Sequence, residues 1–133
     1  MMLARRLWWV VALLGSAVGS TAGASTQLFL GIANAPGANG SYWRSELQVV
    51  NVGSDEVACT LGFGGVQLGA ISLEPEGSYL PRDVLGAHEV EGVGTLTLAC
   101  SSDFVLALAR TYTVAATGTY GQLVPPARVD DAV

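Results

Sequence analysis

The sequence contains no lysine, one histidine and two cysteines, and only 13% of its 133 residues are charged. A structural zinc site usually takes four nitrogen or sulfur ligands. One histidine and two cysteines supply only three, which argues against a zinc site. Without lysine, the glycine-rich stretch 61–69 lacks the side chain that phosphate-binding loops use, and no helical pattern follows it. We therefore predict neither a metal site nor a cofactor.

Positive charge is also scarce, because six arginines stand against eleven acidic residues and give a net charge of −5. If the N-terminal segment with Arg5 and Arg6 is removed, the balance becomes 4 − 11 = −7. Nucleic acids and anionic membrane surfaces attract basic proteins. Neither is expected as a partner.

The single histidine, His88, is the one ordinary candidate for a general base. A hydrolytic triad also needs a serine or cysteine nucleophile on a strained turn and an acid that orients the histidine. The sequence has no G-x-S-x-G motif, so we expect an exposed loop histidine and a protein that is not an enzyme. A hydrolase that uses His88 is the less favoured alternative.

Acidic residues occur in pairs that suggest two further chemistries. Glycoside hydrolysis needs two carboxylates in a cleft, and calcium needs several oxygen ligands. No pair has the spacing of a calcium-binding loop, so solvated turns explain them equally well. The pairs are Asp55-Glu56, Glu74/Glu76, Glu89/Glu91 and Asp130-Asp131.

The beginning of the chain has the layout of a secretory signal peptide. Arg5 and Arg6 precede the apolar stretch 7–18, and small residues follow as far as Ala24. A membrane anchor is the alternative, but a bilayer span needs roughly 20 apolar residues, and Gly15 begins to interrupt the run before that. We predict cleavage after Ala24 and an exported protein, either periplasmic or extracellular.

The predicted domain covers residues 25–133, with an ordered core at about 26–125 and a tail at 126–133. Its size is typical of one domain. Two cysteines in an exported chain favour a disulfide between Cys59 and Cys100, which would close a loop of about 40 residues. Two buried free thiols or a metal pair are the alternatives.

Apolar and polar residues alternate with a period of two, which is typical of strands with one buried face. The pattern is present in the segments 28–32, 42–52, 57–63, 94–100, 104–112 and 119–124. The residues expected to face the core are Leu28, Leu30, Ile32, Leu47, Val49, Val57, Cys59, Leu61, Phe63, Leu96, Leu98 and Cys100. In segment 104–112, Phe104, Leu106 and Leu108 form a face of larger residues, and Ala107 and Ala109 make the opposite face thin.

Turn-forming residues separate these segments at 35–40, 53–56, 64–65 and 74–77. A single helical turn is possible at 83–85, and Pro125-Pro126 should end the last strand. About seven short antiparallel strands predict an all-β sandwich. A closed barrel is the alternative.

Arginine and aromatic residues occur together near strand ends. Such side chains often anchor partners at interfaces. The candidate binding residues are Arg44, Arg110, Tyr112 and Tyr120. In the alternative structural interpretation, Trp43 and Tyr112 cover the ends of the core and Arg110 pairs with an acid such as Asp83.

Three segments carry a resemblance to a known group of proteins. They are GANGSYWRSELQVVN at 37–51, LEPEGSYLPRDVL at 73–85, and 110–122, which begins RTYT and ends GTYGQ. Together they resemble a poorly characterised group of bacterial secreted modules with immunoglobulin-like or fibronectin-like sandwiches. The resemblance implies an extracellular binding, adhesive or structural role and no established catalytic residue.

The sequence therefore predicts a secreted, non-catalytic β-sandwich that binds a cell-surface, polysaccharide or protein partner. The alternative is a structural subunit that assembles with its own kind through an exposed sheet edge.

Overall fold

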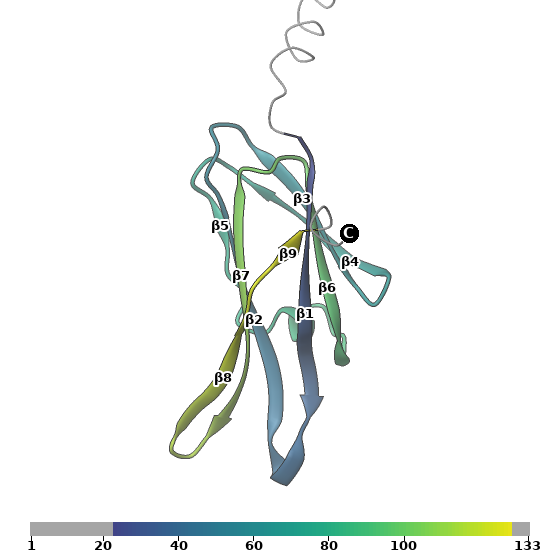
Figure 1. Cartoon of the computed structure of the whole chain (residues 1–133), viewed down its shortest axis with the longest axis vertical. Coiled ribbons are helices and arrows are strands. Elements are labelled where there is room, and N and C mark those ends of the chain that lie inside the picture. Colours follow the sequence, from purple (N-terminus) through teal and green to yellow (C-terminus); the bar gives the residue numbers. More distant parts are fainter. Residues whose placement is uncertain (1–22, 129–133) are drawn as a thin grey trace, which may run out of the picture.

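The computed structural model describes residues 23–128, which contain nine strands and two short helical turns (Figure 1). The predicted signal peptide falls almost entirely outside this range, as do Asp130 and Asp131. The elements are β1 (Ser25–Pro36), η1 (Ala38–Gly40), β2 (Tyr42–Asn51), β3 (Val57–Phe63), β4 (Val66–Leu73), β5 (Ser78–Tyr79), α2 (Val84–Ala87), β6 (Gly92–Cys100), β7 (Val105–Ala115), β8 (Gly118–Val124) and β9 (Ala127–Arg128).

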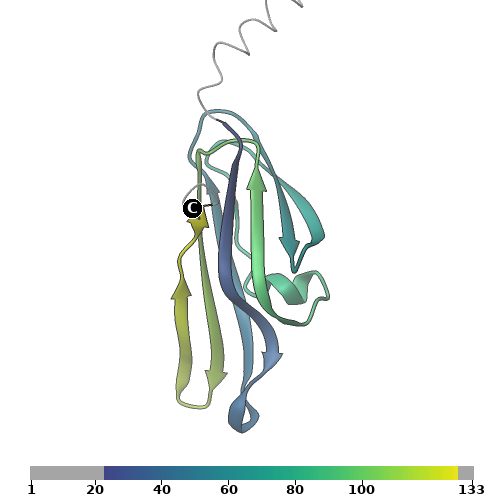
Figure 2. The same ribbon diagram turned by 45° about the vertical axis from the view of Figure 1, so that its right-hand side comes forward.

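All strand pairings are antiparallel, and the order across the sheet is β4-β3-β6-β1-β2-β7-β8. The short strands lie off this path, with β5 beside β2 and β9 beside β1. The predicted all-β fold is confirmed, and the seven longer strands match the expected number. Figure 2 shows β8 free at one side of the sheet.

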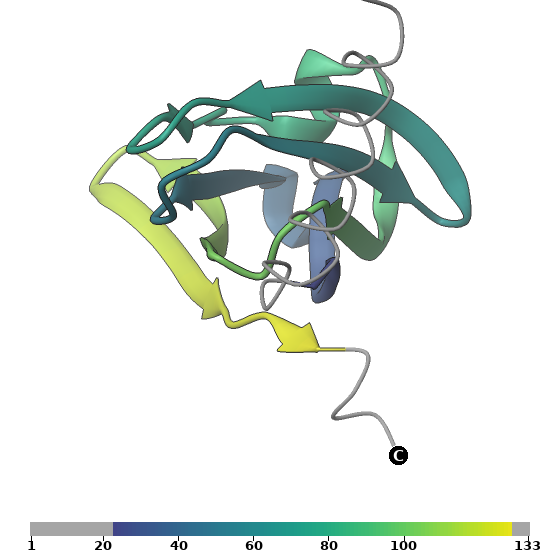
Figure 3. The same cartoon turned by 90° about the horizontal axis from the view of Figure 1, so that it is seen from above.

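The pairing gives one open sheet instead of the two separate sheets expected of a sandwich. Ala35 pairs with Trp43 and Pro36 with Tyr42, and these two pairs join β1 to β2. Seen from above in Figure 3, the sheet is strongly curled. The edge strands are β4 and β8, so the sheet is not a closed barrel.

Both halves of the curled sheet contribute to one apolar core. Fully buried side chains come from the β1–β6–β3 side, from β2 and β7, and from α2. They include Phe29, Ile32, Leu47, Val49, Val57, Leu61, Val84, Leu85, Leu96, Leu98 and Val105. The inward faces predicted for β2, β3 and β6 are confirmed, although Phe63 is only half-buried.

The face predicted for the first strand is wrong. Phe29 is fully buried, whereas Leu30 is 62% exposed and Leu28 is half-buried. The register of β1 against β6 shifts between Phe29 and Ile32, and Gly31 in between has a φ of +78°. This bulge brings both Phe29 and Ile32 to the core side, which simple alternation does not predict.

In β7 the thin face points to the core. Val105 and Ala109 are buried and Ala107 packs against the core, whereas Leu106 is 63% exposed and Leu108 is also exposed. The large-residue face of the strand is therefore the outer one. Its leucines become surface residues.

Side-chain hydroxyls replace backbone pairing where β1 and β2 diverge. The Ala33 N–H donates to Ser45 Oγ at 2.9 Å, and Thr111 Oγ1 donates to the Gly31 carbonyl oxygen at 2.8 Å. Ser45 Oγ and Thr111 Oγ1 are 2.7 Å apart. Since each hydroxyl has one proton, Ser45 donates to Thr111. The result is a continuous chain of hydrogen bonds from β1 through β2 and β7 back to β1.

The connections follow the predicted turns. Gly64 and Gly65 join β3 to β4 with positive φ angles, and Asp83 Oδ1 caps α2 by accepting from the Gly86 N–H at 3.0 Å. The proline pair after β8 does not end all pairing, because β9 follows within the predicted tail and pairs with Gln27 and Leu28 of β1.

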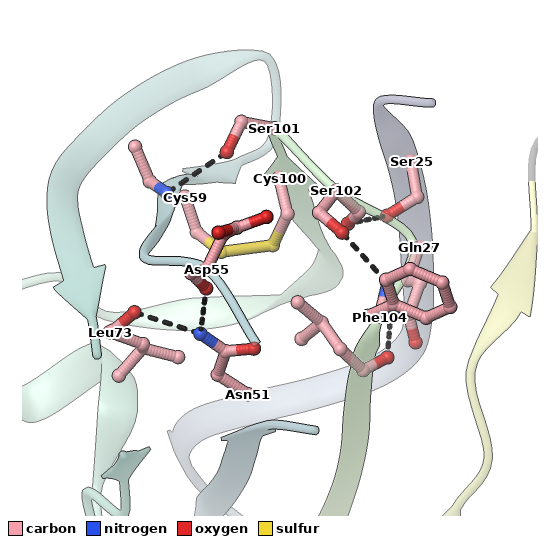
Figure 4. The surroundings of a disulfide bond; sticks show 12 residues. Ser25, Gln27, Asn51, Asp55, Cys59, Leu73, Cys100, Ser101, Ser102 and Phe104 are labelled. Carbon is pink, nitrogen blue, oxygen red and sulfur yellow. Dashed lines mark hydrogen bonds between the residues drawn. A yellow bond between two sulfur atoms is a disulfide. The ribbon is translucent and has the colours of Figure 1, made fainter. Parts of the chain in front are cut away.

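Cys59 and Cys100 form a disulfide, as predicted (Figure 4). They lie directly opposite each other on β3 and β6, with their Cα atoms 4.0 Å apart. Both are buried. Beside the bridge, the amide of Asn51 donates to the carbonyl oxygens of Asp55 and Leu73 at 2.8 and 3.0 Å.

Replacing both cysteines (Cys59→Ala/Cys100→Ala) should lower the free energy of unfolding by about 4 kcal/mol, because the unfolded chain loses a cross-link between residues 41 apart. Urea unfolding measures the difference. Reductant should destabilise the wild type and leave the double variant unchanged. Equal stability of the two oxidised proteins would contradict the expectation.

Ser45→Ala should lower the free energy of unfolding by about 1–3 kcal/mol, since it leaves the Ala33 N–H without an acceptor in a buried place. Ser54→Ala, at an exposed turn position, is the matched control and should change stability by less than about 0.5 kcal/mol. Urea unfolding of the two variants side by side tests this, and equal effects would argue against the hydroxyl chain.

Candidate functional site

The side chains of β2, β7 and β8 that point away from the core form a surface that we call the outer face. Strand register defines it, because directly paired residues share a face. Arg44 pairs with Tyr112, Glu46 with Arg110, Gln48 with Leu108 and Val50 with Leu106. The members are Tyr42, Arg44, Glu46, Gln48, Val50, Leu106, Leu108, Arg110, Tyr112 and Leu123.

Two arginines of the outer face stack on tyrosine rings. The guanidinium carbon of Arg44 lies 4.7 Å from the ring centre of Tyr42, and that of Arg110 lies 5.1 Å from the ring centre of Tyr112. The Tyr112 hydroxyl donates to the Arg82 carbonyl oxygen at 2.7 Å. The stacking favours these positions of the two arginines, and the hydrogen bond anchors the ring on which Arg110 lies.

Each arginine also has an acidic neighbour. Arg44 Nε lies 3.6 Å from Asp83 Oδ2, and Arg110 Nη1 lies 3.7 Å from Glu46 Oε1. The anticipated partner Asp83 therefore pairs with Arg44 and not with Arg110. Both pairs are partly exposed and longer than good hydrogen bonds, so each adds little stability. Guanidinium N–H groups on this face remain able to bind an incoming carboxylate.

A glycine on β8 makes room for Arg110. A Cβ atom at Gly121 would lie 2.9 Å from the Thr111 carbonyl oxygen and 3.0 Å from Arg110 Nε. The Nε atom is buried there and has no hydrogen-bond partner among residues 23–128. Any side chain at position 121 would displace the arginine.

Apolar hollows continue from the arginines along β2 and β7. One of about 350 Å³ is lined by Val50, Leu80, Leu106 and Leu108, and a neighbouring one of about 200 Å³ by Glu46, Leu108, Arg110 and Leu123. Gln48 and Leu108 line both. The outer face therefore combines an apolar groove with two fixed arginines at one end.

The structure brings together three of the four candidate binding residues. Arg44, Arg110 and Tyr112 lie side by side on the outer face, whereas Tyr120 pairs with Thr113 and shares the opposite face. The Tyr120 hydroxyl lies 3.1 Å from Thr117 Oγ1. Trp43 also lies off the outer face, with its indole against Gly37. The exposed leucines also belong to the outer face, although the sequence did not mark them as candidate binding residues.

Charge is unevenly distributed over the described residues. The outer face and the adjoining Arg82 and Asp83 hold three arginines and two acids, a balance of 3 − 2 = +1. The remaining charged residues between 23 and 128 are Arg128 and seven acids, which give 1 − 7 = −6. The outer face is thus less acidic than the rest of the described residues taken together.

His88 lies half-buried at the end of α2 and not on an exposed loop. Its Nε2 is 3.5 Å from the Tyr79 hydroxyl, and its ring packs against Gly69 of β4. Within residues 23–128, no three His, Cys, Asp or Glu side chains are grouped so that they could hold a metal ion. None of the helices in that range is long and apolar enough to cross a membrane.

Comparison with known proteins gives little further information. No protein-family model matches the chain, and no curated protein matches it. A crystal structure described as Thermotoga maritima 1070 is similar over 77% of this chain and 93% of that chain, with 14% sequence identity and a TM-score of 0.47.

Burial raises the pKa of Tyr79 above its ordinary value of 10.0. The folded state therefore favours the neutral phenol, whose stabilising effect is complete below pH about 10 and is lost as the pH rises through the pKa of the folded state. Tyr79→Phe should reduce the alkaline decline in the free energy of unfolding. Urea unfolding on both sides of pH 10 measures it, with Tyr120→Phe as control. Identical declines in wild type and Tyr79→Phe would refute this.

Proposed function

We propose that this domain is an exported, non-catalytic binding module whose outer face recognises a partner protein. The stacked pairs Tyr42–Arg44 and Tyr112–Arg110, beside an apolar groove, are the observation that carries the proposal. Arginine, tyrosine and an apolar centre are the usual composition of protein interfaces.

Exposure of the leucines supports this assignment. Leu80, Leu106, Leu108 and Leu123 are all exposed on or beside the same surface. Scattered apolar residues are common on protein surfaces, but a contiguous apolar patch with charged groups at its rim is typical of an interaction site.

A protein partner fits better than a polysaccharide. Sugars bind on the free faces of aromatic rings. Here a guanidinium lies over the ring of Tyr42 and another over that of Tyr112, and Tyr120 is on the opposite face. The charge of the outer face, +1 against −6 elsewhere, favours a partner surface that combines carboxylates with apolar side chains.

The disulfide supports the cellular location. Such bonds persist in non-reducing compartments. With the signal-like residues at the start of the chain, this favours export to the periplasm or beyond the cell.

The arginines of the outer face should determine partner binding. We expect Arg44→Ala/Arg110→Ala to weaken binding by a factor of about 30 or more, because interface arginines are commonly worth about 2 kcal/mol. Arg128→Ala on β9 and Tyr120→Ala on the opposite face are the controls.

Immobilised oxidised protein, wild type and variants, would be exposed to solubilised envelope proteins and, in parallel, to insoluble polysaccharides. Bound proteins would be identified by mass spectrometry, purified, and their affinities measured again. A partner retained equally well by Arg44→Ala/Arg110→Ala would eliminate the outer face as its site. Saturable retention on polysaccharide alone would mean that the partner is a polysaccharide and not a protein.

A further inference from the structure

β8 is an edge strand without the features that usually protect such strands. Unpaired edges are commonly blocked by charged residues, proline, bulges or covering segments. The seven residues of β8, GTYGQLV, include no charge and no proline, and all but Val124 are exposed. Every second residue of an edge strand points its N–H and C=O groups away from the sheet. β8 therefore offers a complete backbone ladder to another strand.

The other edge strand, β4, also lacks charge but is less suitable. Its register against β3 shifts at Leu61 and Gly62, and the ring of His88 packs on Gly69 at its middle. By contrast, β7 and β8 pair without interruption from Ala109–Val124 to Ala115–Gly118. A regular strand is the better template for pairing, because bulges bend an edge away from a partner.

Electrostatics identifies a second copy of this chain as a suitable occupant. Two acidic proteins repel each other over most of their surfaces. From Phe104 to Arg128, however, the charged residues are Arg110 and Arg128 alone, and β8 itself is neutral. Two copies can thus approach edge to edge along strands that carry no acid, since the nearby Glu46 on β2 is paired with Arg110.

We propose that two copies of the protein associate through their β8 strands, antiparallel and about a two-fold axis at Gly121. Gly121 is the middle residue of β8, so this register places it opposite its own equivalent. Thr119 then lies opposite Leu123 of the second copy, and Tyr120 opposite Gln122. The exposed Leu123 and Tyr120 gain neighbours, and no like charges meet.

This pairing has a consequence for the surface described above. The sheet continues from β7 and β8 of one copy into those of the other, so two outer faces become one surface with two arginine clusters. Two linked sites bind a partner with repeated epitopes more tightly than one. The association itself does not depend on the proposed function, because it involves the backbone edge and not the arginines.

A charge-pair experiment tests both the association and its register. In Thr119→Glu/Leu123→Glu, two acids of one copy lie directly opposite two acids of the other, and we expect dimerisation weakened roughly tenfold or more. In Thr119→Glu/Leu123→Lys, each acid faces a base of the second copy, which should restore the dimer. Both positions are exposed, but position 123 lies directly opposite Arg110 on β7, so the fold of each variant has to be checked. Circular dichroism and thermal unfolding provide this check.

The protein, exported from the full-length chain and purified oxidised, would be studied by sedimentation velocity over about two decades of concentration. We expect a monomer–dimer equilibrium that the like-charge variant loses and the opposite-charge variant recovers. A wild type that is monomeric throughout, or a dimer insensitive to the like-charge variant, overturns the proposal. Partner retention, measured separately with Arg44→Ala/Arg110→Ala, reports on the proposed function alone.

Discussion

Two backbone pairs, Ala35–Trp43 and Pro36–Tyr42, join β1 to β2, and in the stretch from Gly31 to Ala33, where the strands diverge, side-chain hydroxyls take the place of the ladder. Backbone groups left unpaired in a buried place are costly. Here Ser45 accepts from the buried Ala33 N–H and Thr111 donates to the exposed Gly31 carbonyl oxygen, so the strand is held by side chains of β2 and β7 at the point where its backbone ladder with β2 is absent. Because these hydroxyls point inward, they also fix which residues of β2 and β7 point outward.

The outer face follows from that constraint. With Thr111 inward, Arg110 and Tyr112 must face outward, and the same alternation carries Leu106 and Leu108 to the surface. Small residues of β7 then face a core already filled by leucines and valines of neighbouring strands. The larger side chains of β7 therefore lie at the surface, where they form part of the outer face.

Sequence patterns predict the strands better than their faces. Period-two alternation locates β2, β3, β6 and β8 and the inward positions of Leu47 and Leu98, and cysteine number and compartment predict the disulfide. The inward face of β1 was not predictable, since a bulge at Gly31 leaves no mark in the alternation. Arginine and aromatic composition finds Arg44, Arg110 and Tyr112, but only strand register shows that Tyr120 lies on the other side. The leucines of the outer face could be recognised only once the structure showed which face of β7 is buried.

The position of β1 in the sheet affects the order in which the protein can fold. β1 is the first strand of the domain, yet it pairs with β6, more than fifty residues later, and with β9 near the end of the described chain. Because a chain is synthesised from its N-terminus, β1 emerges long before these partners. The apolar side chains of β1 then lack their partners until the rest of the chain has been synthesised. The sheet around β1 is therefore completed only once the chain as far as Arg128 is available.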